Sequence, residues 1–169
     1  MGSFGVVVIP EPYPPAIFRR MTEQPDLAEM TAGVHALVPI LGAMGLEVLE
    51  SAPGRASARI PSGPNVNHFG VAYAGSLFSV AEMLGGIIGG HFDVPGAVPL
   101  VKRLEIDFTR PAMTASTATT TLSDEEIARV QSEATANGKA NFELLTEVVD
   151  EEGTVVARTH GFYQLRVMG

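Results

Sequence analysis

Glu82 is the residue whose type and position point most directly to chemistry. It is the one charged residue in the segment from 71 to 90, which is otherwise built from apolar and small residues. A carboxylate in such a segment is costly to bury unless it has a partner or lines a pocket. Burial also raises the pKa of a carboxyl group toward neutrality, which suits a general acid, a general base or a nucleophile. A carboxylate that only reaches the surface, or pairs with a core partner, is the alternative interpretation.

A polar loop precedes this segment and adds a second candidate feature. Asn67 and His68 stand just before Gly70, and a helix is expected to begin a few residues later. The first turn of a helix presents free backbone N–H groups and the positive end of the helix dipole. Such groups would stabilise a carbonyl oxygen as it becomes an oxyanion. A loop that only turns the chain is the alternative.

The elements that must position these residues follow from hydrophobic periodicity. Residues 73–88 predict a helix that is apolar on nearly every side and is therefore buried, with small residues that let other backbone approach closely. In a chain of 169 residues a sheet must wrap around such a helix. The adjacent strand pairs predict a mainly antiparallel sheet and an α+β fold. Further helices are expected over 26–41, shortened or kinked by a proline at position 39, and over 123–138, with strands over 46–52, 55–61, 100–110, 116–122, 139–149 and 154–167.

Composition excludes several classes of protein and site. Hydrophobic residues make up 46% of the chain and charged residues 18%, which is too apolar for intrinsic disorder. A net charge of −8 without a basic block argues against nucleic acid or a membrane surface as a partner. The chain has no cysteine, which rules out disulfides and thiolate metal sites, and its histidines lack metal-ligand spacing, so no metal is expected.

The chain is expected to consist of an arm and one domain. Four prolines between positions 10 and 15 prevent regular helix and sheet, so residues 1–24 predict an N-terminal arm. Residues 25–169 have the length of a single domain. We find neither a signal peptide nor a stretch that could cross a bilayer, and we expect a cytoplasmic protein.

Two segments resemble the signature motifs of hotdog-fold acyl-CoA thioesterases. The stretch 67–82, NHFGVAYAGSLFSVAE, is similar to the central-helix motif of that family. The stretch 104–112, LEIDFTRPA, is similar to its alternating strand that closes in Arg-Pro-Ala. The resemblance covers about residues 26–167. Within the family, the chain is most similar to the phenylacetate-pathway type and to the thioesterase domain that is also found fused to acetyltransferases. It implies the hotdog fold, a curved antiparallel sheet wrapped around a central helix.

The resemblance also implies catalytic roles for three residues. The backbone N–H of Gly75 would donate to the thioester carbonyl. Glu82 would activate a water molecule or attack directly, and Asn67 of the other protomer would bind the thioester or the water. The reaction implied is hydrolysis of an acyl-CoA or acyl-carrier thioester to an acid and a thiol, with no cofactor.

Substrate binding and assembly are implied in the same way. Two protomers would pair their sheets edge to edge, as a homodimer or a dimer of dimers, and acyl-CoA would lie in the groove between them. Tyr73 departs from the family, because phenylacetate-type members often have histidine there. The implied substrate contacts are His68, Tyr73, Ser76 and Arg110, and the expected lining of an apolar acyl pocket is Phe78, Met83, Leu84 and Ile87.

Two alternatives share the fold. Hotdog dehydratases of 3-hydroxyacyl thioesters use a histidine and a carboxylate, and His68 here precedes Glu82 by 14 residues. The spacing between the motif glycine and the carboxylate favours a thioesterase. Gly75 precedes Glu82 by seven positions, whereas the glycine of the dehydratase pattern precedes its carboxylate by five. The other alternative is a non-catalytic protein that binds acyl thioesters.

Overall fold

The computed structural model describes residues 26–168, so the arm predicted over residues 1–24 lies outside the described residues. The predicted order of helices and strands is confirmed, with the first two predicted helices each divided in two. The helices are α1 (Leu27–Leu37), α2 (Pro39–Ala43), α3 (Ala74–Glu82), α4 (Leu84–Gly90) and α5 (Asp124–Asn137), with a short 3-10 turn at Gly63–Asn65. The strands are β1 (Glu47–Ala52), β2 (Arg55–Ile60), β3 (Ala97–Phe108), β4 (Ser116–Thr121), β5 (Lys139–Val149) and β6 (Val155–Val167).

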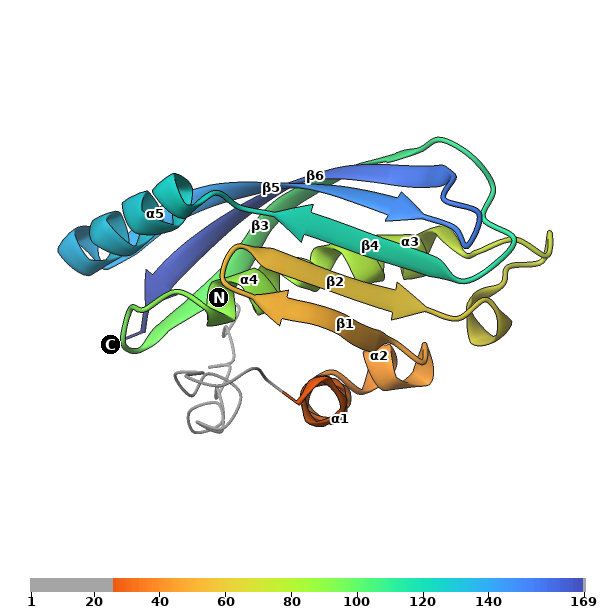
Figure 1. Ribbon diagram of the computed structural model, residues 1–169, viewed down its shortest axis with the longest axis horizontal. Helices are drawn as coiled ribbons and strands as arrows, with labels where there is room; N and C mark the ends of the chain where they lie inside the picture. The colour runs from red at the N-terminus through yellow and green to blue at the C-terminus, as the bar shows by residue number, and fades with distance from the viewer. Residues whose placement is uncertain (1–25, 169) are drawn as a thin grey trace, which may run out of the picture.

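The six strands form one antiparallel sheet in the order β1-β2-β4-β5-β6-β3. The sheet curves over α3 and α4, which lie in its concave side (Figure 1). This is the predicted α+β arrangement of a sheet wrapped around a central helix. Strand β3 pairs only with β6 among the described residues, so its other edge is free.

Strict alternation explains why β5 buries one face. In β5, buried and exposed residues alternate along nearly the whole strand, as the period of two in a strand requires. Its inward residues Phe142 and Leu144 pack against the central helical segment, whose Val80 and Leu84 are fully buried. The core therefore lies between the concave face of the sheet and one side of α3 and α4.

The first helix ends earlier than its hydrophobic pattern alone suggests. Asp26 caps α1 by accepting from the backbone N–H groups of Ala28 and Glu29. The helix stops at Leu37, and Pro39 begins α2 at its first position, where a proline needs no N–H partner. The predicted shortening by Pro39 is confirmed.

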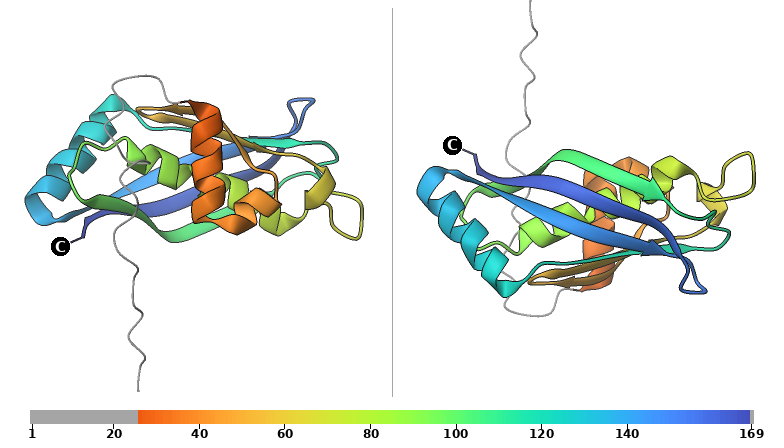
Figure 2. Two further views of the ribbon diagram at one scale, coloured as in Figure 1. Left: turned by 90° about the horizontal axis from the view of Figure 1, so that it is seen from below. Right: turned by 90° about the horizontal axis from the view of Figure 1, so that it is seen from above.

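Helix α1 crosses the open side of the central helical segment, opposite the sheet (Figure 2, left). The whole of α1 lies within the described residues, and none of its side chains is fully buried. Two hydrogen bonds hold it to β1 and the residue before that strand. His35 Nε2 lies 2.7 Å from the carbonyl oxygen of Leu46, and the backbone N–H of Val48 donates to Thr31 Oγ1 at 3.0 Å.

The central segment differs from the single buried helix that was predicted. It is interrupted at Met83, and its side toward α1 is open rather than buried. Two consecutive glycines, Gly85 and Gly86, follow the interruption and weaken helical continuity there. The small residues do allow close approach, as predicted, because a Cβ at Gly85 would collide with the ring of Tyr163.

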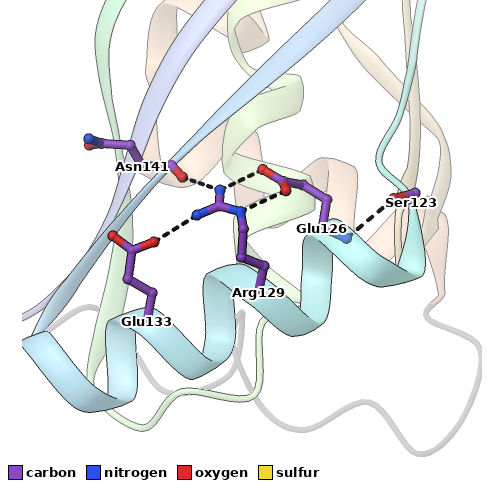
Figure 3. A network of polar contacts seen from close by, with 5 residues as sticks. All are labelled: Ser123, Glu126, Arg129, Glu133 and Asn141. Atoms are coloured by element: carbon purple, nitrogen blue, oxygen red, sulfur yellow. Dashed lines mark hydrogen bonds and ion pairs between the residues drawn. The ribbon is translucent and has the colours of Figure 1, made fainter.

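Helix α5 is confirmed in its predicted place. Ser123 caps it by accepting from the N–H of Glu126 at 3.2 Å, and Gly138 ends it with a φ of 72°. Arg129 donates to both oxygens of Glu126, at 2.8 and 2.6 Å, to Glu133 at 2.7 Å, and to the backbone carbonyl of Asn141 in β5 at 2.7 Å (Figure 3). This network ties the helix to the sheet.

Candidate active site

A cavity of about 400 Å³ lies between α1–α2 on one side and α3, α4 and β3 on the other. Glu82 lies in its wall, together with Ser79 one turn earlier and Gly86 one turn later on the same face of the helical segment. Of the residues expected to line an acyl pocket, Met83 and Ile87 line this cavity, whereas Phe78 and Leu84 do not. The complete lining is Met30, Val34, Leu37, Val38, Ile40, Leu41, Ser51, Ser79, Glu82, Met83, Gly85, Gly86, Ile87, Gly90, His91, Pro99, Val101 and Tyr163.

The carboxylate of Glu82 is half-buried, and the described part of the chain offers it no partner. Within residues 26–168 it has neither a hydrogen-bond partner nor an ion pair. Burial raises the pKa of Glu82 above its ordinary value, because the charged form loses solvation that no partner replaces. A raised pKa makes a carboxylate a stronger base, which is the property that a general base needs.

Tyr163 contacts the backbone of Glu82 and also lines the cavity, and it is not among the site residues predicted from the sequence. Its hydroxyl donates to the backbone carbonyl of Glu82 at 3.1 Å, at the point where the helix is interrupted. Burial, and secondarily the charge of Glu82, raise the pKa of Tyr163, so the hydroxyl stays protonated as a donor. Its ring stacks on Phe142 at 5.4 Å between Gly85 and Gly161. A glycine inside a strand, such as Gly161, is the signal in the sequence that marks such a close approach.

A polar pair also lines the cavity. The Nε2 atom of His91 lies 2.9 Å from Ser51 Oγ. Burial lowers the pKa of His91, so the imidazole is neutral at pH 7. His91 follows the last residue of α4, whereas Glu82 is the last residue of α3, so the two lie at different ends of α4.

Gly75 lies in the first turn of α3. The N–H groups of Ala74 and Gly75 have no acceptor among the described residues. The ring of Tyr73 lies against Gly75, and a Cβ there would collide with it. Ser76 is buried, and its own N–H donates to the carbonyl of Tyr73 at 2.9 Å. The first turn therefore offers Gly75, rather than Ser76, to a ligand.

The loop before α3 places Asn67 and His68 outside the cavity. The Oδ1 atom of Asn67 accepts from the backbone N–H groups of Phe69 at 2.8 Å and Val71 at 3.4 Å, and so closes the loop. His68 is exposed, with its ring 3.8 Å from that of Phe69. Neither side chain approaches Glu82 of the same chain closely enough to share its cavity.

Arg110 lies near the same end of the molecule as Gly75. The N–H of Ala72 donates to the carbonyl of Ala112 at 2.8 Å, which holds the segment after β3 beside the loop before α3. Arg110 is exposed and forms no ion pair with any described residue. The arginines that do pair with carboxylates are Arg55, Arg59, Arg103, Arg129 and Arg158.

One chain does not bring Gly75 and Glu82 to the same reacting atom. They lie on the same face of α3, about 10 Å apart along its axis by the rise of an α-helix. Helix N–H groups point toward the N-terminus, so an oxygen bound at Gly75 lies farther still from Glu82. Two hydrogen bonds through one water span only about 6 Å.

Residues 26–168 contain neither a cluster of metal-ligating side chains nor a membrane-spanning helix. No group of three or more histidine, aspartate or glutamate side chains there is arranged to hold a metal ion. No helix in residues 26–168 is long and apolar enough to cross a membrane.

Solved structures share this fold. A protein of unknown function from Pseudomonas aeruginosa, described as a probable thioesterase, is 33% identical, with a TM-score of 0.78 over 86% of this chain and 99% of that one. A thioesterase from Haemophilus influenzae is 14% identical, with a TM-score of 0.67 over 87% and 95% of the two chains. The PaaI protein of the E. coli phenylacetic acid degradation operon is 20% identical, with a TM-score of 0.62 over 84% and 94%. The last two likenesses show the fold alone.

Sequence comparison gives a family as well as a fold. A search of curated proteins finds no match. The model of the family described as a domain of unknown function, DUF4442, matches residues 28–163, which is most of the chain. The curved antiparallel sheet around a helix confirms the hotdog fold that the motifs predicted. The chain therefore belongs to the DUF4442 family, with the fold of the hotdog thioesterases.

Proposed function

We propose that this protein hydrolyses an acyl-CoA or acyl-carrier thioester to a free acid and a thiol. The observation that carries the proposal is the half-buried carboxylate of Glu82, which has no partner among residues 26–168, in the wall of an apolar cavity. The thioesterase descriptions of structures with this fold support it.

The residues support a mechanism with one base and one oxyanion donor. Ionised Glu82 takes a proton from water as the water oxygen attacks the thioester carbonyl carbon. The carbonyl oxygen becomes an oxyanion, which the free N–H of Gly75 stabilises. The intermediate then collapses, the C–S bond breaks, and the leaving thiolate takes the proton back from Glu82. Asn67 would bind the thioester or the water through its amide nitrogen, since its oxygen is engaged in the loop.

Two chains are needed for this mechanism. Because Gly75 and Glu82 of one chain lie too far apart to share a substrate, we assign the oxyanion donor to one protomer and the base to the other. The free edge of β3 suits edge-to-edge pairing into a homodimer, which could pair again as a dimer of dimers. The apolar side chains of Ile40 and Val101 lie at the cavity, 59% and 45% exposed, where a second chain would cover them.

Arg110 is the proposed contact for the phosphates of CoA. Its guanidinium is exposed, without an ion pair among the described residues, at the end of the molecule that carries Gly75. Guanidinium groups bind phosphate oxygens in a bidentate manner. His68 and Tyr73, both exposed beside the first turn of α3, are the other proposed contacts.

The dehydratase alternative is less well supported by the geometry. A dehydratase needs a histidine and a carboxylate that both contact the carbon chain of the same bound substrate. His68 is exposed on its loop and does not line the cavity with Glu82. His91 does line it, but its Nε2 is engaged with Ser51.

The test is release of thiol from a panel of acyl-CoAs, followed with a thiol-reactive dye. The chain has no cysteine, so the protein itself contributes no signal. We expect release by the wild type and its loss in Glu82→Gln. Release that persists in Glu82→Gln would overturn the role of Glu82. No release from any acyl-CoA or acyl-carrier substrate would favour a protein that binds thioesters without hydrolysing them.

The dimer has its own test. Light scattering at the enzyme's working concentration should give a mass of at least twice 17.8 kDa. An active monomer would contradict a site built from two chains.

A further inference from the structure

We propose that the cavity beneath α1 is the acyl-binding site and that it takes an uncharged, straight acyl chain of about eight to twelve carbons. The inference rests on the proposed thioester hydrolysis for the identity of the ligand, but not for the existence of the site. It is carried by the chemistry of the cavity wall, by its length and by its volume.

The wall excludes charged acyl chains. Among the described residues that line the cavity, Glu82 is the one acidic residue, and there is no lysine or arginine. A chain that ends in a carboxylate would therefore meet no cation, and would lose its hydration without compensation. Most of the remaining lining is aliphatic, so a hydrocarbon chain gains from burial there.

Helix α1 supplies the roof of this site. Its apolar residues Met30, Val34 and Leu37 face the cavity, although none of them is fully buried in the chain by itself. The hydrogen bonds of His35 and Thr31 to the β1 region hold the helix in place over the space. A helix held over an apolar cavity by two hydrogen bonds is suited to enclose a hydrocarbon chain.

The length of the cavity limits the chain that it can hold. Glu82 and His91 are nine residues apart, or about 13 Å along a helical path. A staggered hydrocarbon advances about 1.3 Å for each bond of about 1.5 Å, so a chain whose thioester lies at Glu82 reaches His91 after roughly ten carbons. We assign the end of the site to the hydrogen-bonded pair of His91 and Ser51, both of which line the cavity.

The volume of the cavity gives a consistent upper limit. A cavity of about 150 Å³ holds benzene, with its six carbons. The 400 Å³ found here would therefore hold roughly sixteen carbons at complete filling. Filling is never complete in a cavity that opens to solvent, so eight to twelve carbons fits both limits.

Gly86 offers a way to shorten the site without disturbing the core. It is exposed, lies one helical turn after Glu82, and a Cβ built on it meets nothing within 4 Å. A leucine at this position would project into the cavity while improving helix propensity. Gly63 is the matched control, because its Cβ position is also open but it does not line the cavity.

The experiment measures binding and turnover in parallel. Thermal shift with straight-chain alkanols of four to fourteen carbons, which are uncharged and need no hydrolysis, reports binding to the cavity. Thiol release from acyl-CoAs of the same lengths reports turnover. Wild type and Gly63→Leu should both show the largest responses at eight to twelve carbons. In Gly86→Leu both optima should move to shorter chains, and the preference for ten carbons over four should fall at least tenfold, since each buried methylene is worth about fourfold in affinity.

The outcomes separate this inference from the proposed function. Alkanol binding that shifts in Gly86→Leu, without thiol release from any substrate, would leave the site standing and overturn the hydrolysis. Thiol release whose length profile is unchanged in Gly86→Leu would overturn the site and leave the hydrolysis standing. If Gly86→Leu does not fold, Val34→Phe is the second variant. It adds bulk to the cavity from α1 and should also move the optimal chain length to shorter chains. Efficient turnover of acyl chains that end in a carboxylate would also overturn the proposal.

Discussion

Glu82 on α3 and Glu126 on α5 are both helical glutamates, but their surroundings move their pKa values in opposite directions. Arg129 forms two hydrogen bonds to Glu126 and lowers the pKa of that carboxyl group (Figure 3). Glu82 has no partner among the described residues, and burial raises its pKa. Arg129 also joins Glu133 and the carbonyl of Asn141, so Glu126 and Glu133 share one cation.

The difference indicates what each carboxylate contributes. A paired charge at the surface adds modestly to stability and has little capacity to take up a proton at neutral pH. An unpaired, half-buried charge costs stability, and its raised pKa makes it a better base. We therefore expect substitutions in the α5 network to change stability and leave turnover unchanged, and removal of the Glu82 carboxylate to lower turnover without lowering stability.

The largest expected effect is on turnover in Glu82→Gln. The amide keeps the shape of the side chain but cannot take a proton, so kcat/KM for a ten-carbon acyl-CoA should fall by roughly 10²–10⁴-fold. The free energy of unfolding at pH 7 should not fall, because a desolvated charge has been removed. The matched variant Glu126→Gln should keep wild-type turnover. Equal losses of turnover in the two variants would remove the distinction between the two glutamates.

The second effect concerns Tyr163, which holds Glu82 as Arg129 holds Glu126, but through the backbone. Tyr163→Phe leaves the carbonyl of Glu82 without its donor and should lower the free energy of unfolding by about 1–3 kcal/mol. It should also lower kcat/KM about tenfold by loosening the position of Glu82, with KM little changed.

A double variant separates positioning from stability in this case. If Tyr163 acts through Glu82, Tyr163→Phe should have no further effect on the residual turnover of Glu82→Gln, while its effect on unfolding persists. A full tenfold loss in the Glu82→Gln background would assign Tyr163 a role in turnover that does not depend on Glu82.

Most of the fold was predictable because local patterns determined it. The helix over 123–138 and the strands over 139–149 and 154–167 were predicted from the sequence and are confirmed as α5, β5 and β6. The interruption of the central helix at Met83 was not predicted, although Gly85 and Gly86 follow it in the sequence. The hydroxyl of Tyr163 that donates to the carbonyl of Glu82 there is a tertiary contact across 81 residues, which local patterns do not show.

The site was predictable only in part for the same reason. Glu82 stands out in the sequence as a charge among apolar residues, and the cavity beside it is in the structure. The roof formed by α1 and the pair of Ser51 and His91 come from segments that no motif connects with Glu82. The roles of Asn67 and Gly75 stay predictions, because in one chain they lie apart from Glu82.

A smaller effect is expected from Arg129→Ala. The arginine is exposed, so its ion pairs with Glu126 and Glu133 are screened, and the free energy of unfolding should fall by about 1 kcal/mol or less in urea. The loss should shrink at high salt. Arg158→Ala removes a single cross-strand pair with Glu147 and should cost less. Turnover should be unchanged in both variants, and a loss of turnover in Arg129→Ala would connect α5 with the site.

The smallest effect, and the most specific, is the sign of the pH dependence of stability. The pKa of Glu82 is raised above 4.5 in the folded state, so its contribution is complete below the unfolded pKa and is lost as pH rises through the folded pKa. The pKa of Glu126 is lowered, so its contribution is present above the unfolded pKa and is lost as pH falls through the folded pKa. Urea unfolding from about pH 4 to 8 should therefore show Glu82→Gln gaining stability relative to wild type as pH rises, and Glu126→Gln losing it. Slopes of the same sign in the two variants would mean that Glu82 is paired in solution, and would remove the reason for calling it the base.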